Sequence, residues 1–233
     1  MIVVHTGDGT INATAAALAG WSGALLALPG GTLNLLARRL HGGASPEAIL
    51  ETALAGPCRI RSVPMISGID SDTDIAALVG VFAGPTTAWG DVRETLRRRD
   101  IAALAEAVPR AVTETFGGDQ VQLEGDGRRY PAIYAEAMRG AEGPLLRLMG
   151  FLADGAGELF RHGFAWLGGD FRKGPNEPLG ECRSATILCD GDAMGLLVDG
   201  ERGHEGCQLT LRAVDSPIAF VATRSDRFAE DGM

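Results

Sequence analysis

The sequence predicts an α/β lobe built on a partial parallel sheet, followed by an antiparallel β-sandwich domain with helical inserts. Two short apolar segments, residues 2–5 and 24–28, each run through a glycine-rich turn into a helix-like segment. That order is typical of parallel strands joined by crossover helices. After about residue 57 the pattern changes to short β-like runs separated by Gly, Asp and Pro, which indicates antiparallel strands.

The predicted elements follow from hydrophobic pattern and turn residues. Helices are expected at residues 11–19, 33–40 and 46–54, the last with Pro46 near its start. The β-like runs cover residues 57–66, 76–83, 184–189, 194–199, 207–213 and 217–222, and helical inserts are expected at 88–98, 101–113 and in part of 144–162.

These elements set the predicted domain limits. Residues 1–56 form an incomplete α/β nucleotide-binding lobe, residues 57–222 form the β-sandwich, and residues 223–233 form a polar tail. The two apolar strands should lie in a sheet interior, because parallel sheets are normally buried on both faces.

Composition excludes some classes of function. The net charge is −9 and the sequence pI about 4.9, which argues against non-specific nucleic-acid binding because that needs a basic face. The four cysteines form no C-x-x-C pair, and neither a signal peptide nor a long apolar run is visible. We therefore expect a reduced, cytoplasmic protein.

The first glycine-rich turn, Gly7-Asp8-Gly9-Thr10, delivers a strand to the N-terminus of a helix. Free N–H groups and the helix dipole favour phosphate at such a position. Asp8 would hold Mg²⁺ or accept a proton from an attacking hydroxyl. The alternative is a plain Asp-Gly turn. A dinucleotide fingerprint is excluded by Asn12, which stands where a third glycine is needed.

The second turn runs from Pro29 through Gly30, Gly31 and Thr32 to Asn34. Both turns should lie at the carboxyl ends of parallel strands, on the edge of the sheet where ligands bind. Asn34 offers an amide that can read a base or a sugar, and its alternative role is a helix cap.

A third candidate is the acidic turn Asp199-Gly200-Glu201, which follows the apolar run Leu196-Leu197-Val198. By itself this sequence is typical of a β-hairpin turn of the Asp-Gly type.

The three turns together resemble the signatures of the diacylglycerol kinase and sphingosine kinase-like bacterial lipid kinase family. Gly-Asp-Gly-Thr-Ile-Asn at 7–12 is similar to GGDGT-x-N, Pro-Gly-Gly-Thr-Leu-Asn-Leu-Leu-Ala-Arg at 29–38 to P-x-G-T-x-N-D-x-A-R, and Val-Asp-Gly-Glu at 198–201 to the late D-G-E motif. Order and rough spacing agree from residue 1 to about residue 222.

This resemblance implies an enzyme that moves the γ-phosphoryl group of ATP to a lipid hydroxyl, with Mg²⁺, in a cleft between the two domains. The nucleotide-binding residues that it implies are Gly7, Asp8, Gly9, Thr10, Gly31, Thr32 and Asn34. It makes Asp199 the leading candidate for general base, with Glu201 beside it and Asp8 as the second candidate. The ligands of the metal are left open.

Three positions depart from the family pattern. Thr6 replaces a glycine, Ala13 replaces a glutamate and Leu35 replaces an aspartate, so two carboxylates of the family pattern are missing. Family members also carry further α/β elements before GGDGT. We therefore expect the 233-residue chain by itself to be poorly soluble, weakly stable and inactive, with apolar surface exposed near residues 2–5 and 11–28.

Two alternatives stay open. One is a non-catalytic remnant that acts as a binding or interaction module. The other is an enzyme like the NAD kinases, which share the GGDGT loop and would use the pair Asn176-Glu177 at a ribose.

A lipid substrate would require peripheral contact with the inner face of a membrane. Candidates for that contact are Leu145, Leu146, Leu148, Met149, Phe151 and Leu152, with Arg147 beside them, unless they are ordinary core residues. The lipid and the oligomeric state are not defined by the sequence.

Overall fold

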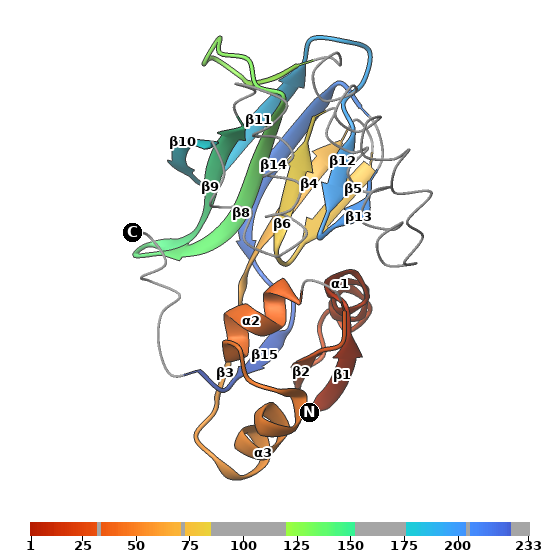
Figure 1. Ribbon diagram of the computed structural model, residues 1–233, viewed down its shortest axis with the longest axis vertical. Helices are drawn as coiled ribbons and strands as arrows, with labels where there is room; N and C mark the ends of the chain where they lie inside the picture. The colour runs from red at the N-terminus through yellow and green to blue at the C-terminus, as the bar shows by residue number, and fades with distance from the viewer. Residues whose placement is uncertain (32–33, 71–72, 85–119, 152–175, 204–205, 225–233) are drawn as a thin grey trace, which may run out of the picture.

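The computed structural model describes residues 1–31, 34–70, 73–84, 120–151, 176–203 and 206–224. They form two lobes, with the α/β lobe below the β-sandwich in Figure 1. The predicted fold class is confirmed, because a small mixed sheet with helices is combined with two antiparallel sheets. The inserts predicted at 88–98 and 101–113 lie outside the described residues.

The sheet of the α/β lobe has the strand order β1-β2-β15-β3. Strand β1 is parallel to β2, β2 is parallel to β15, and β15 is antiparallel to β3. The elements of this lobe are β1 (Ile2–Thr6), α1 (Asp8–Ala17), β2 (Ala24–Pro29), α2 (Leu35–His41), α3 (Pro46–Ala55), β3 (Arg59–Arg61) and β15 (Ala219–Ala222).

Strand β2 lies in the middle of this sheet and is covered on both faces. On one face Ile11 of α1 and Leu36 of α2 pack in the same cluster as Leu25. On the other face Ile49 of α3 packs with Leu26. Every residue of β2 from Ala24 to Leu28 is buried, as an apolar central strand requires.

Strand β1 is an edge strand, so its prediction as a sheet-interior strand is wrong. Among the described strands it pairs only with β2, and Ile2 and Val3 remain 37% and 44% exposed. Apolar exposure near residues 2–5 is thereby confirmed. The prediction of apolar exposure fails for residues 24–28, because β15 returns from the C-terminal part of the chain as the second neighbour of β2.

The β-sandwich consists of a six-stranded and a five-stranded sheet. The first has the order β10-β9-β8-β6-β12-β13 and the second β5-β4-β14-β11-β7. Their strands are β4 (Pro64–Asp70), β5 (Thr73–Ala77), β6 (Gly80–Ala83), β7 (Val121–Leu123), β8 (Ala132–Gly140), β9 (Gly143–Phe151), β10 (Asn176–Cys182), β11 (Ser184–Cys189), β12 (Leu196–Val198), β13 (Glu201–Arg202) and β14 (Gln208–Asp215).

Strand β9 contradicts the predicted helix over residues 144–151, whereas the rest of the predicted range, 152–162, lies outside the described residues. It pairs with β8 along its whole length, from Ala132↔Phe151 to Gly140↔Gly143. Residues two apart on a strand face the same side, and Leu146 and Leu148 belong to the main core between the sheets. The prediction failed because apolar residues at this spacing fit either period over so short a run.

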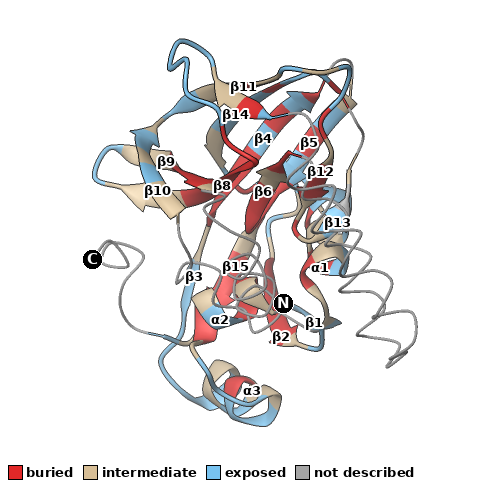
Figure 2. Cartoon of the chain, turned by 45° about the horizontal axis from the view of Figure 1, so that its top comes forward, coloured by how far each residue is buried: buried red, intermediate tan, exposed pale blue. Residues whose placement is uncertain are grey.

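The proposed membrane contact at Leu145–Phe151 is therefore wrong for its central residues. Leu146, Leu148 and Met149 are 0%, 3% and 7% exposed, and Figure 2 shows β9 largely within the buried and intermediate classes. Leu152 lies outside the described residues. In that part of the chain which the structure describes, none of the helices has both the length and the apolar character needed to cross a bilayer.

The chain passes between the lobes twice, from β3 to β4 and from β14 back to β15 (Figure 1). The domain limits 1–56, 57–222 and 223–233 remain a prediction. Strand pairing does place β3 and β15 in the first sheet, although both lie in the range predicted for the sandwich. A continuous-segment division misses this pairing because the partner strand of β2 is almost 200 residues away.

Candidate active site

The two glycine-rich turns touch each other through their backbones. Gly7 follows β1 and Gly31 follows β2, and a Cβ added at Gly31 would lie 2.5 Å from Gly7 Cα. The N–H of Gly30 donates to the Thr6 carbonyl oxygen at 3.2 Å. The parallel pairing of β1 and β2 thus brings the turns together, as the sequence predicts. Glycine is needed here for close approach.

We predict that Gly31→Ala opens this contact. The added methyl group would meet backbone atoms of Gly7, which cannot move aside as a flexible side chain does. Overpacking of this kind costs roughly 1–3 kcal/mol in the free energy of unfolding, measured by urea denaturation. Gly43→Ala is the matched control, because a Cβ added at Gly43 would have nothing within 4 Å. Equal stability of the two variants would contradict the contact.

Asn34 holds the second turn closed. Its Oδ1 accepts the N–H of Gly31 at 2.6 Å and its Nδ2 donates to the Gly31 carbonyl oxygen at 2.8 Å. The residue is left-handed, with φ 51°, a conformation that asparagine tolerates better than most residues. Asn34 is the N-cap residue of α2, but its side chain makes no cap hydrogen bond to that helix, so capping by its side chain is wrong. The predicted site residue Thr32 lies outside the described residues.

Asp8 caps α2 across the two turns. Its carboxylate oxygens accept the N–H groups of Leu35 at 2.9 Å and Leu36 at 3.0 Å, and the residue is only 8% exposed. Both N–H groups belong to the first turn of a helix, where no intrahelical acceptor exists. Asp8 therefore has a structural role that the sequence does not reveal. The sequence motif predicts only that this carboxylate holds Mg²⁺ or accepts a proton.

The N-terminus of α1 carries no side-chain cap. Gly7 is the N-cap residue and has no side chain to cap the helix, so among the described residues no side-chain acceptor caps the first N–H groups of α1. Gly9 and Thr10 belong to this first turn, and Thr10 is exposed. Gly9 is not among the residues with positive φ. Glycine is needed at this position because it leaves room for a neighbouring side chain.

That neighbour is Glu201 of the sandwich. A Cβ added at Gly9 would lie 2.8 Å from Glu201 Cγ and 3.3 Å from its Oε1. Glu201 is exposed, and its carboxylate stands beside the positive end of the α1 dipole. The third motif predicted from sequence thus meets the first one across the two lobes.

Asp199 occupies the tight turn between β12 and β13. Val198 pairs with Glu201, and both Asp199 and Gly200 have positive φ, at 50° and 82°, as a two-residue hairpin turn of type I′ requires. The hairpin interpretation is therefore correct, and it coexists with a buried carboxylate that is 7% exposed.

Three backbone N–H groups bind the Asp199 carboxylate. Leu78 donates to Oδ2 at 2.9 Å, and Val79 and Gly80 donate to Oδ1 at 2.8 and 3.0 Å. Burial raises the pKa of Asp199 to about 6, against the lowering effect of these amides, and the negative charge of Asp8 adds to the rise. A carboxylate with a pKa near neutrality suits a general base.

The lobes are further joined by α1 and α2. Asn12 Nδ2 donates to the Ala76 carbonyl oxygen at 2.5 Å, and the guanidinium of Arg39 donates to the carbonyl oxygens of Leu78 and Val79. Leu35 packs partly buried against Tyr134 and Met149 of the sandwich. Ala13 is exposed on α1.

Sequence reasoning missed Arg39 and the turn Leu78–Val79–Gly80. Arg39 lies just outside the second motif, and an apolar stretch such as 78–80 carries no chemical signal. Their roles depend on backbone groups brought together from distant parts of the chain.

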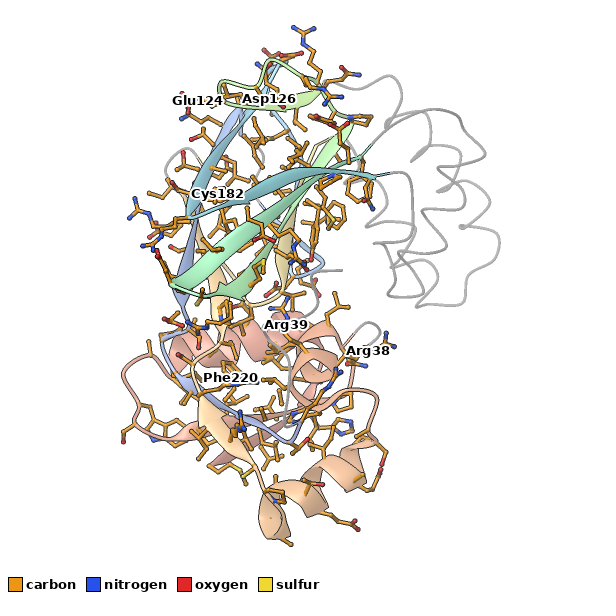
Figure 3. All side chains as sticks on the ribbon, turned by 90° about the vertical axis from the view of Figure 1, so that its left-hand side faces the viewer. Arg38, Arg39, Glu124, Asp126, Cys182 and Phe220 are labelled. Carbon is orange, nitrogen blue, oxygen red and sulfur yellow. The ribbon has the colours of Figure 1, made fainter. Side chains whose placement is uncertain are left out.

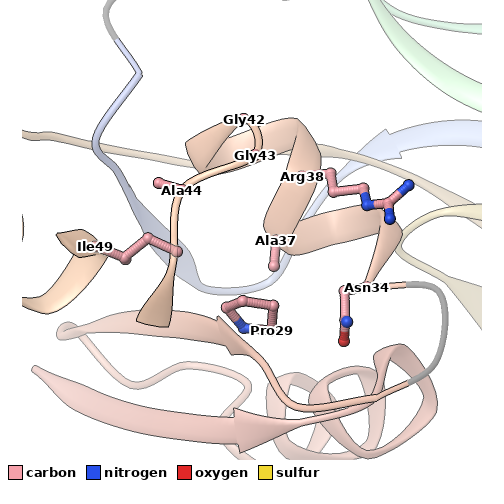
Figure 4. Close-up of a pocket in the computed structure, with 8 residues that line it drawn as sticks. All are labelled: Pro29, Asn34, Ala37, Arg38, Gly42, Gly43, Ala44 and Ile49. Atoms are coloured by element: carbon pink, nitrogen blue, oxygen red, sulfur yellow. The ribbon is translucent and has the colours of Figure 1, made fainter. Parts of the chain in front are cut away.

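A pocket of about 200 Å³ lies on the other side of α2, between that helix and α3. Figure 4 shows Pro29, Ala37 and Ile49 around it, with Asn34 and Arg38 at one side. It is separate from the contact between Gly9 and Glu201.

The described residues offer no preformed metal cage. They contain no group of three or more His, Cys, Asp or Glu side chains suited to a metal, and the Asp8 carboxylate accepts two backbone N–H groups of α2. Mg²⁺ is commonly bound through nucleotide phosphates with few protein ligands, so an ion would have to be held mainly by the nucleotide.

The NAD kinase alternative loses its proposed ribose contact. Glu177 lies at the start of β10 and pairs with Arg128, and β10 is the edge strand opposite β12 and β13 in the six-stranded sheet. The pair Asn176-Glu177 is thus at the far edge from Asp199.

Comparison with known proteins gives the class of domain. Residues 1–64 match the family model described as the diacylglycerol kinase catalytic domain. The resemblance inferred from the motifs is thereby confirmed for residues 1–64, which are similar to that domain. A search of curated proteins found no match.

Among solved structures, the chain is similar to yeast NADH kinase complexed with NADH, at 10% sequence identity and a TM-score of 0.42. The match covers 97% of this chain and 62% of the other, so the chain spans less than two thirds of that kinase.

Proposed function

We propose that this protein is an ATP-dependent lipid kinase that transfers the γ-phosphoryl group to a lipid hydroxyl. One observation carries the proposal: the buried Asp199 carboxylate, with its pKa raised to about 6, belongs to the hairpin whose Glu201 lies against the uncapped N-terminus of α1. A candidate base and a candidate phosphate site thus adjoin. The match of residues 1–64 supports a kinase.

In the proposed reaction, N–H groups at the start of α1 hold phosphate oxygens. As the phosphates approach, they displace the exposed Glu201 side chain, because its negative charge would otherwise repel the phosphate oxygens. Asp199 accepts the proton of the lipid hydroxyl as its oxygen bonds to the γ-phosphorus, and the bond from that phosphorus to the β–γ bridging oxygen breaks, which releases ADP. Mg²⁺ bound together with ATP would neutralise part of the negative charge of the phosphates.

The proposed acceptor is the hydroxyl of a diacylglycerol-like or sphingoid lipid. The enzyme would reach it from the cytoplasm by peripheral contact with the inner face of the membrane. Large apolar side chains that are exposed on the α/β lobe include Leu54 at 69% and Ile60 at 66%, and these replace the strand β9 residues as candidates for that contact.

The test is phosphoryl transfer from ATP labelled on the γ-phosphate to diacylglycerol, sphingosine or NAD⁺. The assay uses the 233-residue chain. Label in a lipid supports the proposal. Label in NAD⁺, or in no acceptor, contradicts it.

Gly9→Asp is the matched variant for this assay. We predict that it abolishes ATP binding, because a second carboxylate beside Glu201 would repel phosphate at the start of α1. The fold should persist, since aspartate in the first turn of a helix is favourable. Isothermal titration with ATP measures the loss, and unchanged affinity would remove α1 from the nucleotide site.

A further inference from the structure

The turn Leu78–Val79–Gly80, between β5 and β6, lies between a cation and a carboxylate. On one side the Asp199 carboxylate accepts the N–H groups of Val79 and Gly80 at 2.8 and 3.0 Å. On the other side the Arg39 guanidinium donates to the carbonyl oxygens of Leu78 at 3.2 Å and Val79 at 3.5 Å. Figure 3 shows Arg39 at the junction of the lobes.

These contacts share two peptide groups. The Leu78 carbonyl and the Val79 N–H belong to one peptide group, and the Val79 carbonyl and the Gly80 N–H belong to the next. The order guanidinium, C=O, N–H, carboxylate therefore occurs twice in parallel. Each peptide dipole has its negative end toward Arg39 and its positive end toward Asp199, and hydrogen bonds in such chains polarise one another.

The charges around Asp199 define what Arg39 opposes. Asp8 lies on α1, Glu201 on β13 and Arg39 on α2. Burial and the charge of Asp8 both act against the ionised form of Asp199. A positive charge beyond the turn is expected to act in the opposite direction, since a cation favours a nearby carboxylate.

We propose that Arg39 is a positioning residue for Asp199, and that through the two peptide groups of the turn it keeps that carboxylate ionised and fixed in orientation. The electrostatic link stands on the geometry of the turn. Its catalytic consequence rests on the proposed function, in which Asp199 takes the proton. Arg38 is adjacent in sequence but exposed, so the link distinguishes two neighbouring arginines.

The test is titration of the Asp199 carboxyl by ¹³C NMR in the wild type and in Arg39→Met, Arg39→Lys and Arg38→Met. We expect the pKa of Asp199, about 6 in the wild type, to rise by roughly half a unit to one unit in Arg39→Met, less than for a cation in direct contact. Arg39→Lys should shift it less. Arg38→Met removes the same charge at an exposed position and should leave it in place.

An unchanged pKa in Arg39→Met, or an equal rise in Arg38→Met, would overturn the proposal. If Arg39→Met does not fold, Arg39→Gln decides, because its neutral amide also removes the cation while keeping polar donors; absence of a rise there overturns the proposal. In an active enzyme the acid limb of the kcat profile should move to higher pH by the same amount while KM for ATP holds. A pKa rise without any phosphoryl transfer in the wild type would refute the proposed function and leave the electrostatic link established.

Discussion

Asp199→Asn is expected to lower kcat for phosphoryl transfer by about 10²–10⁴-fold, with little change in KM for ATP. The reason is that a general base acts on the hydroxyl proton in the transition state, and an amide cannot accept that proton. Steady-state kinetics with varied ATP measures both constants. Asp74→Asn, an exposed aspartate on β5, is the control and should keep wild-type rates. A near-normal kcat in Asp199→Asn would assign the proton to another group.

The same variant should change how stability depends on pH. The folded protein keeps a proton on Asp199 up to about pH 6, whereas the unfolded chain loses it near the ordinary value of 3.8. Wild-type stability from this group therefore falls as pH rises through that window. His41 acts in the opposite direction, because burial lowers its pKa from 6.5 to about 4 and stability from it rises between those values.

In the wild type these two contributions oppose each other, whereas in Asp199→Asn only the contribution of His41 remains. We expect urea denaturation of Asp199→Asn to show stability that rises between pH 4 and pH 6.5, with a flatter dependence in the wild type. Identical pH profiles would mean that the Asp199 carboxyl is not buried in solution.

Asp8→Ala is expected to destabilise the fold, in addition to any effect on activity. The variant leaves the N–H groups of Leu35 and Leu36 without their acceptor, and Leu36 is fully buried. Loss of a helix cap costs about 0.5–2 kcal/mol, and a buried unsatisfied donor about 1–3 kcal/mol. A loss of about 2 kcal/mol would lower Tm by roughly 4–8 °C in a chain of this size.

Calorimetry measures this shift, and Glu47→Ala is its control. Glu47 lies in the first turn of α3 and is exposed, so its loss should change Tm much less. If Asp8→Ala kept the wild-type Tm but lost activity, Asp8 would act on substrate or metal and the capping role would be wrong.

The local elements of the α/β lobe could be predicted because their signals are local. The strand–glycine–helix pattern placed β1, α1 and β2 nearly where the structure has them, and Pro46 marked the start of α3. The position of each strand in the sheet was harder to predict from the sequence. The strand that completes the first sheet, β15, comes from residues 219–222, and no sequence signal near residues 24–28 indicates that it pairs with β2.

The candidate site shows the same division. The motifs identified Asp8, Asp199 and Glu201 as candidate catalytic residues. The structure brings Asp199 and Glu201 to the start of α1. The partners of these residues were hidden, because Asp8 binds N–H groups of α2 and Asp199 binds N–H groups of residues 78–80. A backbone N–H is the same for every residue except proline, so no side-chain pattern can reveal such a partner.

ATP phosphates should bind at the start of α1, where the three motifs meet, and a ¹⁵N NMR titration with ATP reports on that binding residue by residue. We expect the amide signals of Gly9 and Thr10 to shift with a saturable dependence on ATP. The signal of Glu201 should follow as its side chain is displaced, and Gly43 should not respond. Shifts confined to the pocket at Gly42, Gly43 and Ala44, with Gly9 and Thr10 unchanged, would contradict a phosphate site at α1.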